Sequence, residues 1–158
     1  MTGQLVGIMF EDSCCDRFMH IRDFDLQDKL GLVELWDRCG LTRSWNDPDR
    51  DIERKLESRN GWLLVGILDD RVVAAVMIGF DGHRGWVNYL AVDPDCQRAG
   101  FGRAMMQEAE QRLLAANCPK INLQIRQGNR EAVAFYESIG YSADLVVSMG
   151  KRLIPDSD

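Results

Sequence analysis

No glycine in the chain is followed by the Lys-Ser or Lys-Thr pair of a P-loop, which excludes that type of nucleotide site. Histidine is scarce, with two residues, and the five cysteines are irregularly spaced. We therefore expect no disulfide framework and no metal site. No apolar run approaches the length of a transmembrane helix. The first eighteen residues lack a basic segment, so we also expect no secretory signal.

The length and net charge of the chain limit the number of domains and the kinds of partner that we expect. Its 158 residues correspond to about one domain, and the formal net charge of −6 offers no overall attraction to nucleic acid or acidic lipid. We expect a cytoplasmic protein with reduced thiols that binds neither nucleic acid nor membrane. Residues 1–18 show little periodicity and are interpreted as a tail or a poorly ordered lead-in. Residues 19–158 are expected to form the single domain.

The apolar pattern predicts a mixed α/β fold. Strands are expected at residues 20–24, 62–68, 72–80, 86–92 and 121–125, with one or two more within 141–152. Helices are expected from Asp25 through Cys39, over 49–58, over 102–116 and from Asn129 to Ile139. The result is one mixed, mostly antiparallel sheet of six or seven strands flanked by about four helices.

The segment from Leu90 to Arg103 is the most informative part of the chain. It contains an apolar strand, a turn with a proline, a loop with two glycines and the start of a helix. The first turn of a helix has amides without internal partners and carries the positive end of the helix dipole, which favours an anion. Gly100 and Gly102 permit close approach of the backbone, and Arg98 and Arg103 add positive charge. This pattern predicts a pyrophosphate site.

The spacing of the glycines distinguishes the known phosphate-binding motifs that could contain this loop. A dinucleotide fingerprint is excluded, because Met105 stands where a third glycine is needed and the strand at 121–125 has no carboxylate. What remains is Q-x-x-G-x-G at residues 97–102, preceded by L-x-V-x-P. This string resembles motif A of the GCN5-related N-acetyltransferases, the GNAT family. The alternative is a glycine-rich turn that only connects a strand to a helix.

A second motif strengthens the resemblance. N-x-x-A-x-x-F-Y-x-x-x-G-Y at residues 129–141 is similar to motif B of the same family. Shorter strings such as W-N-D-P at 45–48 and D-G-H-R-G at 81–85 resemble the bacterial YpeA-type acetyltransferases within that family. The resemblance covers about 130 residues. It implies the GNAT fold, with a splay between the fourth and fifth strands.

The resemblance also implies acetyl-coenzyme A (acetyl-CoA) as acetyl donor and an amine as acceptor. The backbone at 90–92 is expected to pair with the pantetheine arm, residues 98–103 to hold the pyrophosphate, and Asn129 to hydrogen-bond the cofactor. The cofactor residues are therefore Leu90, Ala91, Val92, Gln97, Arg98, Ala99, Gly100, Phe101, Gly102, Arg103 and Asn129.

For catalysis, the resemblance assigns Tyr136 as the general acid that protonates the departing thiolate. The general base is open, because Gln124 stands where many relatives have a glutamate. Candidates by position are Asp81, His83, Glu53, and a water held by Asn88 or Tyr89. The absent glutamate also leaves an alternative function, a non-catalytic module that binds or senses acyl-CoA.

The acceptor is expected at residues 41–51, by analogy with the family. Its lining would be Thr42, Arg43, Trp45, Asn46 and Asp47, with His83 nearby. Asp47 is equally well interpreted as a helix cap. An amino acid, a polyamine, an antibiotic and a peptide N-terminus all remain open as acceptors. A homodimer is possible, since related domains often pair through their late strands.

Overall fold

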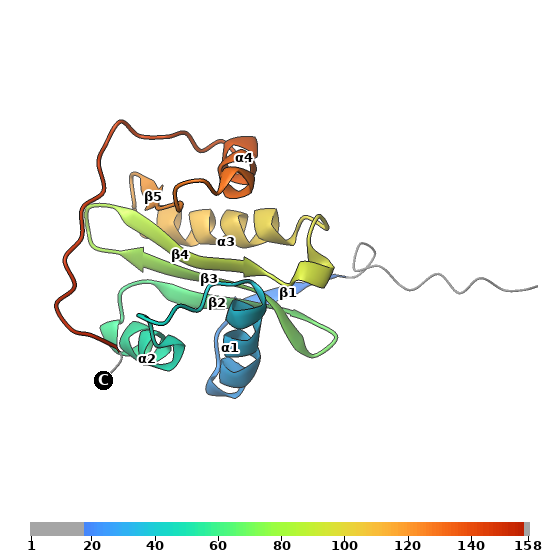
Figure 1. Ribbon diagram of the computed structural model, residues 1–158. Helices are drawn as coiled ribbons and strands as arrows, with labels where there is room; N and C mark the ends of the chain where they lie inside the picture. The colour runs from blue at the N-terminus through green and yellow to red at the C-terminus, as the bar shows by residue number, and fades with distance from the viewer. Residues whose placement is uncertain (1–17, 157–158) are drawn as a thin grey trace, which may run out of the picture.

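The structure, a computed structural model, describes residues 18–156 and confirms the mixed α/β fold (Figure 1). The predicted N-terminal tail lies outside the described residues, apart from Phe18. The strands are β1 (His20–Asp23), β2 (Trp62–Leu68), β3 (Arg71–Phe80), β4 (Gly85–Val92) and β5 (Ile121–Leu123). The helices are α1 (Lys29–Arg38), α2 (Pro48–Ser58), α3 (Phe101–Ala115) and α4 (Arg130–Ser138), with short 3-10 turns at Leu26–Asp28 and Pro94–Cys96.

One sheet in the order β1-β2-β3-β4-β5 organises the molecule. The first four strands are antiparallel, and β5 runs parallel to β4. Helix α3 lies on one face of the sheet with α4 beyond it, while α1 and α2 lie on the other face (Figure 1). Each face has its own buried cluster, one around Met105 and Leu113 of α3, the other around Trp36 of α1 and Ile52 of α2. Within residues 18–156, no helix is long and apolar enough to span a bilayer.

The sheet opens between its fourth and fifth strands, as predicted. Strand β5 pairs with β4 only where Gly85, Trp86 and Val87 face Ile121, Asn122 and Leu123. Beyond this point residues 88–92 have no strand beside them on the β5 side within the described chain. An open edge of this kind presents backbone N–H and C=O groups to a ligand. The expected splay is therefore confirmed.

A β-bulge lies at the start of this open edge. The register of β3 and β4 shifts between Ala75 and Met77, which pair with Ala91 and Asn88. Tyr89 takes up the extra length with φ of +52°, a left-handed conformation that is uncommon outside glycine. The bulge turns the Tyr89 ring toward α1, where it stacks on Trp36 with ring centroids 4.2 Å apart.

The predicted strands within residues 141–152 are wrong for this chain, because that segment forms no strand in the structure. It leaves α4 as an extended segment and runs down to α2 (Figure 1). Strand β5 is also shorter than expected, ending at Leu123 rather than Ile125. The segment does contain apolar residues, but no strand of the described chain lies beside it. Its apolar side chains are therefore exposed, by 78% to 104% at Leu145, Val146, Val147 and Met149.

Candidate active site

The loop between β4 and α3 is held in shape by its own side chains. Asp93 caps the 3-10 turn at Pro94–Cys96 by accepting from the Asp95 N–H at 2.9 Å. The Gln97 side chain donates to the Val92 carbonyl at 3.2 Å. Gln97 therefore holds the loop against the end of β4, and the backbone then reverses through Arg98 at φ of +63°.

The start of α3 has the features of an anion site. Its N-cap is Gly100, at φ of +83°, and no side chain caps the first turn. The N–H groups of Phe101, Gly102 and Arg103 are thus without intrahelical acceptors. A Cβ at Gly100 would meet nothing within 4 Å, so the space in front of this turn is open. These properties fit a diphosphate, which would accept hydrogen bonds from the uncapped amides.

Gly102 has a different reason to be glycine. A Cβ there would lie 3.3 Å from the Phe135 ring of α4 and 3.6 Å from the Val92 side chain. Its absence lets α4 approach α3 and β4 closely. Of the two glycines, only Gly100 has a positive φ and open space before it.

The three residues expected to pair with the pantetheine arm lie on the open part of β4. Leu90 and Val92 are half-buried and pack on the α3 side, whereas Ala91 is buried in the cluster on the α1 side. The Val92 carbonyl also accepts from the Cys39 thiol at 3.3 Å. This edge and the uncapped turn of α3 are joined by only the short loop at 93–100, so a single extended ligand could contact both.

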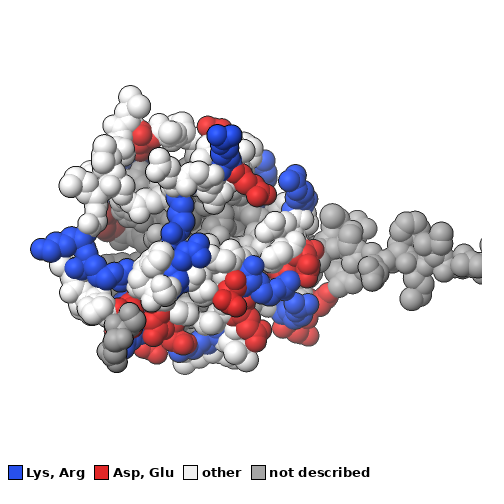
Figure 2. Space-filling view, in the orientation of Figure 1, with Lys and Arg blue, Asp and Glu red and all other residues white. Residues whose placement is uncertain are grey.

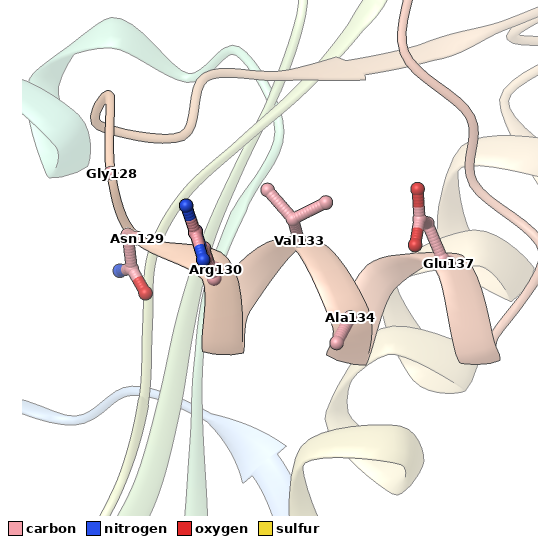
Figure 3. A pocket seen from close by; sticks show the side chains of 6 residues that line it. All are labelled: Gly128, Asn129, Arg130, Val133, Ala134 and Glu137. Carbon is pink, nitrogen blue, oxygen red and sulfur yellow. The ribbon is translucent and has the colours of Figure 1, made fainter.

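Asn129 lies at the start of α4 and caps it. Its side-chain oxygen accepts from the Ala132 N–H at 3.1 Å, which leaves the amide NH₂ to donate elsewhere. Beside it is a shallow depression of about 360 Å³, and Figure 3 shows Arg130, Val133 and Glu137 projecting from the same side of α4. The depression is lined by Gly128, Asn129, Arg130, Val133, Ala134 and Glu137.

Tyr136, the expected general acid, lies in an aromatic cluster. Its ring meets Phe135 and Tyr141 edge-on, with centroids 5.1 and 5.6 Å away. Burial raises the pKa of Tyr136 to about 12. Its hydroxyl has no hydrogen-bond partner among residues 18–156, whereas the Tyr141 hydroxyl donates to Glu110 at 3.0 Å. The phenol therefore keeps its proton at neutral pH and is free to donate it.

The structure places the candidate bases unequally. Asp81 accepts from the N–H groups of His83 and Arg84 at 2.8 and 2.7 Å, and these bonds hold its pKa below the usual value. Both Asp81 and His83 belong to the β3–β4 turn, and Leu90 is roughly 17 Å along the strand from Gly85 at 3.3 Å per residue. Glu53 is exposed and pairs with Lys29 at 3.5 Å. Asp81, His83 and Glu53 therefore do not meet at the open edge.

Tyr89 and Asn88, the residues expected to hold a water as base, lie on the open edge itself. The Tyr89 hydroxyl donates to the Asp51 carboxylate at 2.6 Å and accepts from the Asn46 amide at 3.4 Å. Burial, followed by the bond to Asp51, raises the pKa of Tyr89 to about 12. The Asn88 side chain is exposed. Asp51 was not anticipated from the sequence, because its partner lies on a strand 38 residues away.

The loop expected to bind the acceptor contacts two distant segments. The Arg126 guanidinium lies over the Trp45 ring, 5.6 Å from its centroid, and Arg152 donates to Asn46 at 3.2 Å. The Thr42 hydroxyl donates to the Asp37 carboxylate at 2.9 Å. Asp47 serves as the N-cap of α2, accepting from the Asp49 and Arg50 N–H groups at 2.9 and 3.3 Å. The cap interpretation of Asp47 therefore accounts for its hydrogen bonds.

The C-terminal segment completes this region. Asp156 is buried, pairs with Arg54 through both guanidinium nitrogens and accepts from the Asp47 N–H at 3.3 Å. Arg54 and the Asp47 N–H together hold the pKa of Asp156 near 2. Gln124, the residue in place of the glutamate, donates to Ser148 of the same segment at 2.5 Å. No sequence signal connects these positions.

The chain is similar to known acetyltransferases in sequence and in fold. Residues 30–141 match the model of the acetyltransferase (GNAT) family. An acetyltransferase of Yersinia pestis and one of Pectobacterium atrosepticum are each 41% identical over 140 residues, covering 89% of this chain and 99% of theirs. The structure of AAC(6')-Iy with the bisubstrate analogue CoA-S-monomethyl-acetylneamine is similar in fold, with a TM-score of 0.73 and 14% identity over 86% of this chain and 99% of that one. Within residues 18–156, no cluster of three metal-binding side chains occurs.

Proposed function

Because the chain belongs to the acetyltransferase (GNAT) family, we propose that it transfers an acetyl group directly from acetyl-CoA to a primary amine. The acceptor is a small molecule or the N-terminus of a peptide or protein. Family membership and the named relatives make the chain an N-acetyltransferase and imply acetyl-CoA as donor. The observation that carries the proposal is the open edge of β4 leading directly to the uncapped first turn of α3.

Different residues of this chain would bind different parts of acetyl-CoA. Residues 98–103 offer the diphosphate backbone N–H groups and the guanidinium groups of Arg98 and Arg103, while Leu90, Ala91 and Val92 offer backbone groups along the open edge. Gln97 holds the loop that joins these two parts. The free amide NH₂ of Asn129 supplies one more donor at the start of α4.

When bound, acetyl-CoA supplies an acetyl group activated as a thioester. Tyr136 donates its proton to the sulfur as the C–S bond breaks and the new C–N bond forms. A phenol of pKa about 12 is a weaker acid than a free thiol of pKa about 8.5, so transfer of its proton to a thiolate that has already departed is unfavourable. Donation in concert with C–S cleavage avoids the free thiolate, and burial, which raises the pKa of a thiol as it raises that of the phenol, narrows the gap between the two pKa values.

Removal of the amine proton is assigned to water at the open edge. Gln124 has no basic group, and Asp81, His83 and Glu53 lie outside this edge. The Tyr89 hydroxyl donates a hydrogen bond to Asp51 and accepts one from Asn46. It therefore holds the open edge of β4 in place and does not act as the base. Solvent then carries the proton away.

We also propose that two copies associate through the C-terminal segment, residues 145–154. Its apolar side chains are exposed to water, and the outer edge of β5 has no neighbouring strand within residues 18–156. A second copy of the segment beside β5 would cover both. Light scattering should give the mass of a dimer, and Val147→Lys should lower it to that of one chain. A single-chain mass for the unmodified protein would contradict this. Cys39 and Cys118 form no disulfide within residues 18–156, which supports a cytoplasmic location.

Isothermal calorimetry with acetyl-CoA and an assay of thiol release across a panel of amines test the main proposal. We expect binding of acetyl-CoA and turnover with at least one class of amine. A chain that does not bind acetyl-CoA, or that binds it without turnover for any amine, would contradict the proposal.

A further inference from the structure

Arginines in this chain fall into two groups according to their partners. Six arginines each pair with a carboxylate, and all of these pairs except Arg50–Asp47 join separate segments of the fold: Arg22, Arg38, Arg50, Arg54, Arg71 and Arg112. The remaining arginines within residues 18–156 form no ion pair there. Of these, Arg98, Arg103 and Arg130 belong to the cofactor loop, α3 and α4, and three others gather at the acceptor loop.

These three arginines come from three separate parts of the chain. Arg43 belongs to the acceptor loop and donates to the Thr42 carbonyl at 3.1 Å. Arg126 follows β5 and lies 5.6 Å over the Trp45 ring, and Arg152 of the C-terminal segment donates to Asn46 at 3.2 Å. Figure 2 shows Lys and Arg side chains at a hollow in this face, between the α4 side of the molecule and the α2 side.

The carboxylates near this loop already have partners. Asp47 caps α2, and Asp51 accepts from Tyr89 and pairs with Arg54 at 3.3 Å. Asp156 is paired with Arg54, and Arg152 affects it only as a more distant charge. In a chain with net charge −6, three arginines on or against the acceptor loop therefore have no carboxylate partner within residues 18–156.

This group is connected to the expected point of transfer. Asn46, which contacts Arg152, donates to the Tyr89 hydroxyl at 3.4 Å, and Tyr89 precedes Leu90 on the open edge of β4. An acceptor that reaches the edge with its amine would have its other end at the arginines. Guanidinium groups bind carboxylate and phosphate oxygens well, because their planar donors match both geometries.

We infer that the amine acceptor carries an anionic group of its own, a carboxylate or a phosphate, which Arg43, Arg126 and Arg152 bind beside Trp45. This inference rests on the proposed acetyltransferase function and narrows its substrate class. It disfavours polyamines, whose charges would be repelled. The amine reacts at the β4 edge while the anion fixes the orientation of the acceptor.

Matched pairs of acceptors test the inference with the full chain and acetyl-CoA. Free amino acids are compared with their carboxamides, and glucosamine 6-phosphate with glucosamine. We expect kcat/KM to be about tenfold to a hundredfold higher for the anionic member of at least one pair, as charged hydrogen bonds contribute. The pair that shows the effect distinguishes carboxylate from phosphate. Equal values in both pairs, or a preference for spermidine, would overturn the inference.

Variants distinguish recognition from a structural role. Arg126→Gln and Arg152→Gln should raise KM for the anionic acceptor about tenfold, and should raise it more than they raise KM for the neutral acceptor or for acetyl-CoA. Arg126→Lys should restore part of the loss. The control is Arg59→Gln, because Arg59 is exposed at the end of α2, away from the acceptor loop, and should change nothing. If Arg126→Gln and Arg152→Gln behave as Arg59→Gln does, the arginines are not a binding site.

A readout without turnover separates this inference from the proposed function. With the chain saturated by coenzyme A, N-acetylglycine and its carboxamide are titrated while the arginine side-chain resonances are followed by NMR. Shifts at Arg126 and Arg152 with the acid alone, or with inorganic phosphate, support the inference even if no amine is acetylated. No shift with either anion, in a chain that does turn over amines, rejects it and leaves the acetyltransferase function standing.

Discussion

The Tyr89 hydroxyl donates a 2.6 Å hydrogen bond to the Asp51 carboxylate and so joins the bulge of β4 to helix α2. The contact fixes a strained residue near the start of the open edge, because Tyr89 has φ of +52°. Its ring is held by the stack on Trp36, and its hydroxyl by Asp51 and Asn46. The edge expected to receive the thioester is therefore supported from the side where the acceptor is expected.

Tyr89→Phe keeps the stack on Trp36 and removes the bond to Asp51. We expect the free energy of unfolding to fall by about 1 to 2 kcal/mol, with a higher KM for the acceptor. Because folding raises the pKa of Tyr89 from about 10 to about 12, its stabilisation is complete below about pH 10 and is lost as the pH rises through 12. Urea unfolding of both proteins measures the difference.

A double-mutant cycle with Asp51→Asn assigns that loss to the contact. Tyr89→Phe should cost less in the Asp51→Asn background than in the unmodified chain, since an amide oxygen accepts the hydrogen bond less strongly than a carboxylate does. Strict additivity would mean that the two side chains act independently and would refute the assignment.

Tyr136→Phe tests the general acid. The change keeps the edge-on contacts of the ring with Phe135 and Tyr141 and removes the proton. We expect kcat to fall about a hundredfold or more with unchanged affinity for acetyl-CoA. In the unmodified protein kcat should not decline up to about pH 10, because the pKa of Tyr136 is about 12 and the phenol stays protonated. Steady-state rates from pH 7 to 10 check both statements.

Tyr141→Phe is the matched control for that variant. Its hydroxyl bonds to Glu110 in the same aromatic cluster, so the change disturbs the cluster similarly without removing the proposed proton donor. An equal loss of kcat in the two variants would show that packing, and not proton donation, is responsible.

Gly100→Ala tests the diphosphate site. An alanine at φ of +83° costs about 1 to 2 kcal/mol, and displacement of the loop should weaken binding of acetyl-CoA. Gly82→Ala is the control, since Gly82 has φ of +87°, equally open surroundings and a place in the β3–β4 turn. Both variants should lose similar stability by urea unfolding, but only Gly100→Ala should lose affinity in calorimetry. Equal affinities would place the diphosphate elsewhere.

Local patterns predicted most of the fold, including the loop and the helix N-terminus that we propose as the cofactor site. The loop after β4 and the N-cap at Asn129 depend on residues close together in sequence, and the structure has both where they were expected. The splay followed from the family resemblance and is confirmed by pairing that ends at Val87 and Leu123. Gly102 was expected to let the backbone approach a ligand, but a Cβ there would instead meet the Phe135 ring. This contact between α3 and α4 cannot be inferred from the spacing of residues in the sequence.

The region where we propose that the acceptor binds depends on tertiary contacts that the sequence did not predict. Tyr89 and Asp51, Trp45 and Arg126, and Arg54 and Asp156 meet from separate elements, so no local period relates them. Residues 141–152 were expected to supply one or two strands. A strand also needs a neighbouring backbone, and this segment has none within the described chain.

Asp156→Asn tests whether the C-terminal segment is fastened to α2 by charge. Folding lowers the pKa of Asp156 from 3.8 to about 2, so its contribution to stability is present above about pH 4 and is lost as the pH falls through 2. The variant should be less stable than the unmodified chain at pH 7, and the difference should shrink toward pH 2. Asp144→Asn is the control, because the Lys120–Asp144 pair is exposed and should contribute little at any pH. Urea unfolding across this range measures both, and a difference for Asp156→Asn that persists undiminished at pH 2 would mean that shape, rather than charge, fastens the segment.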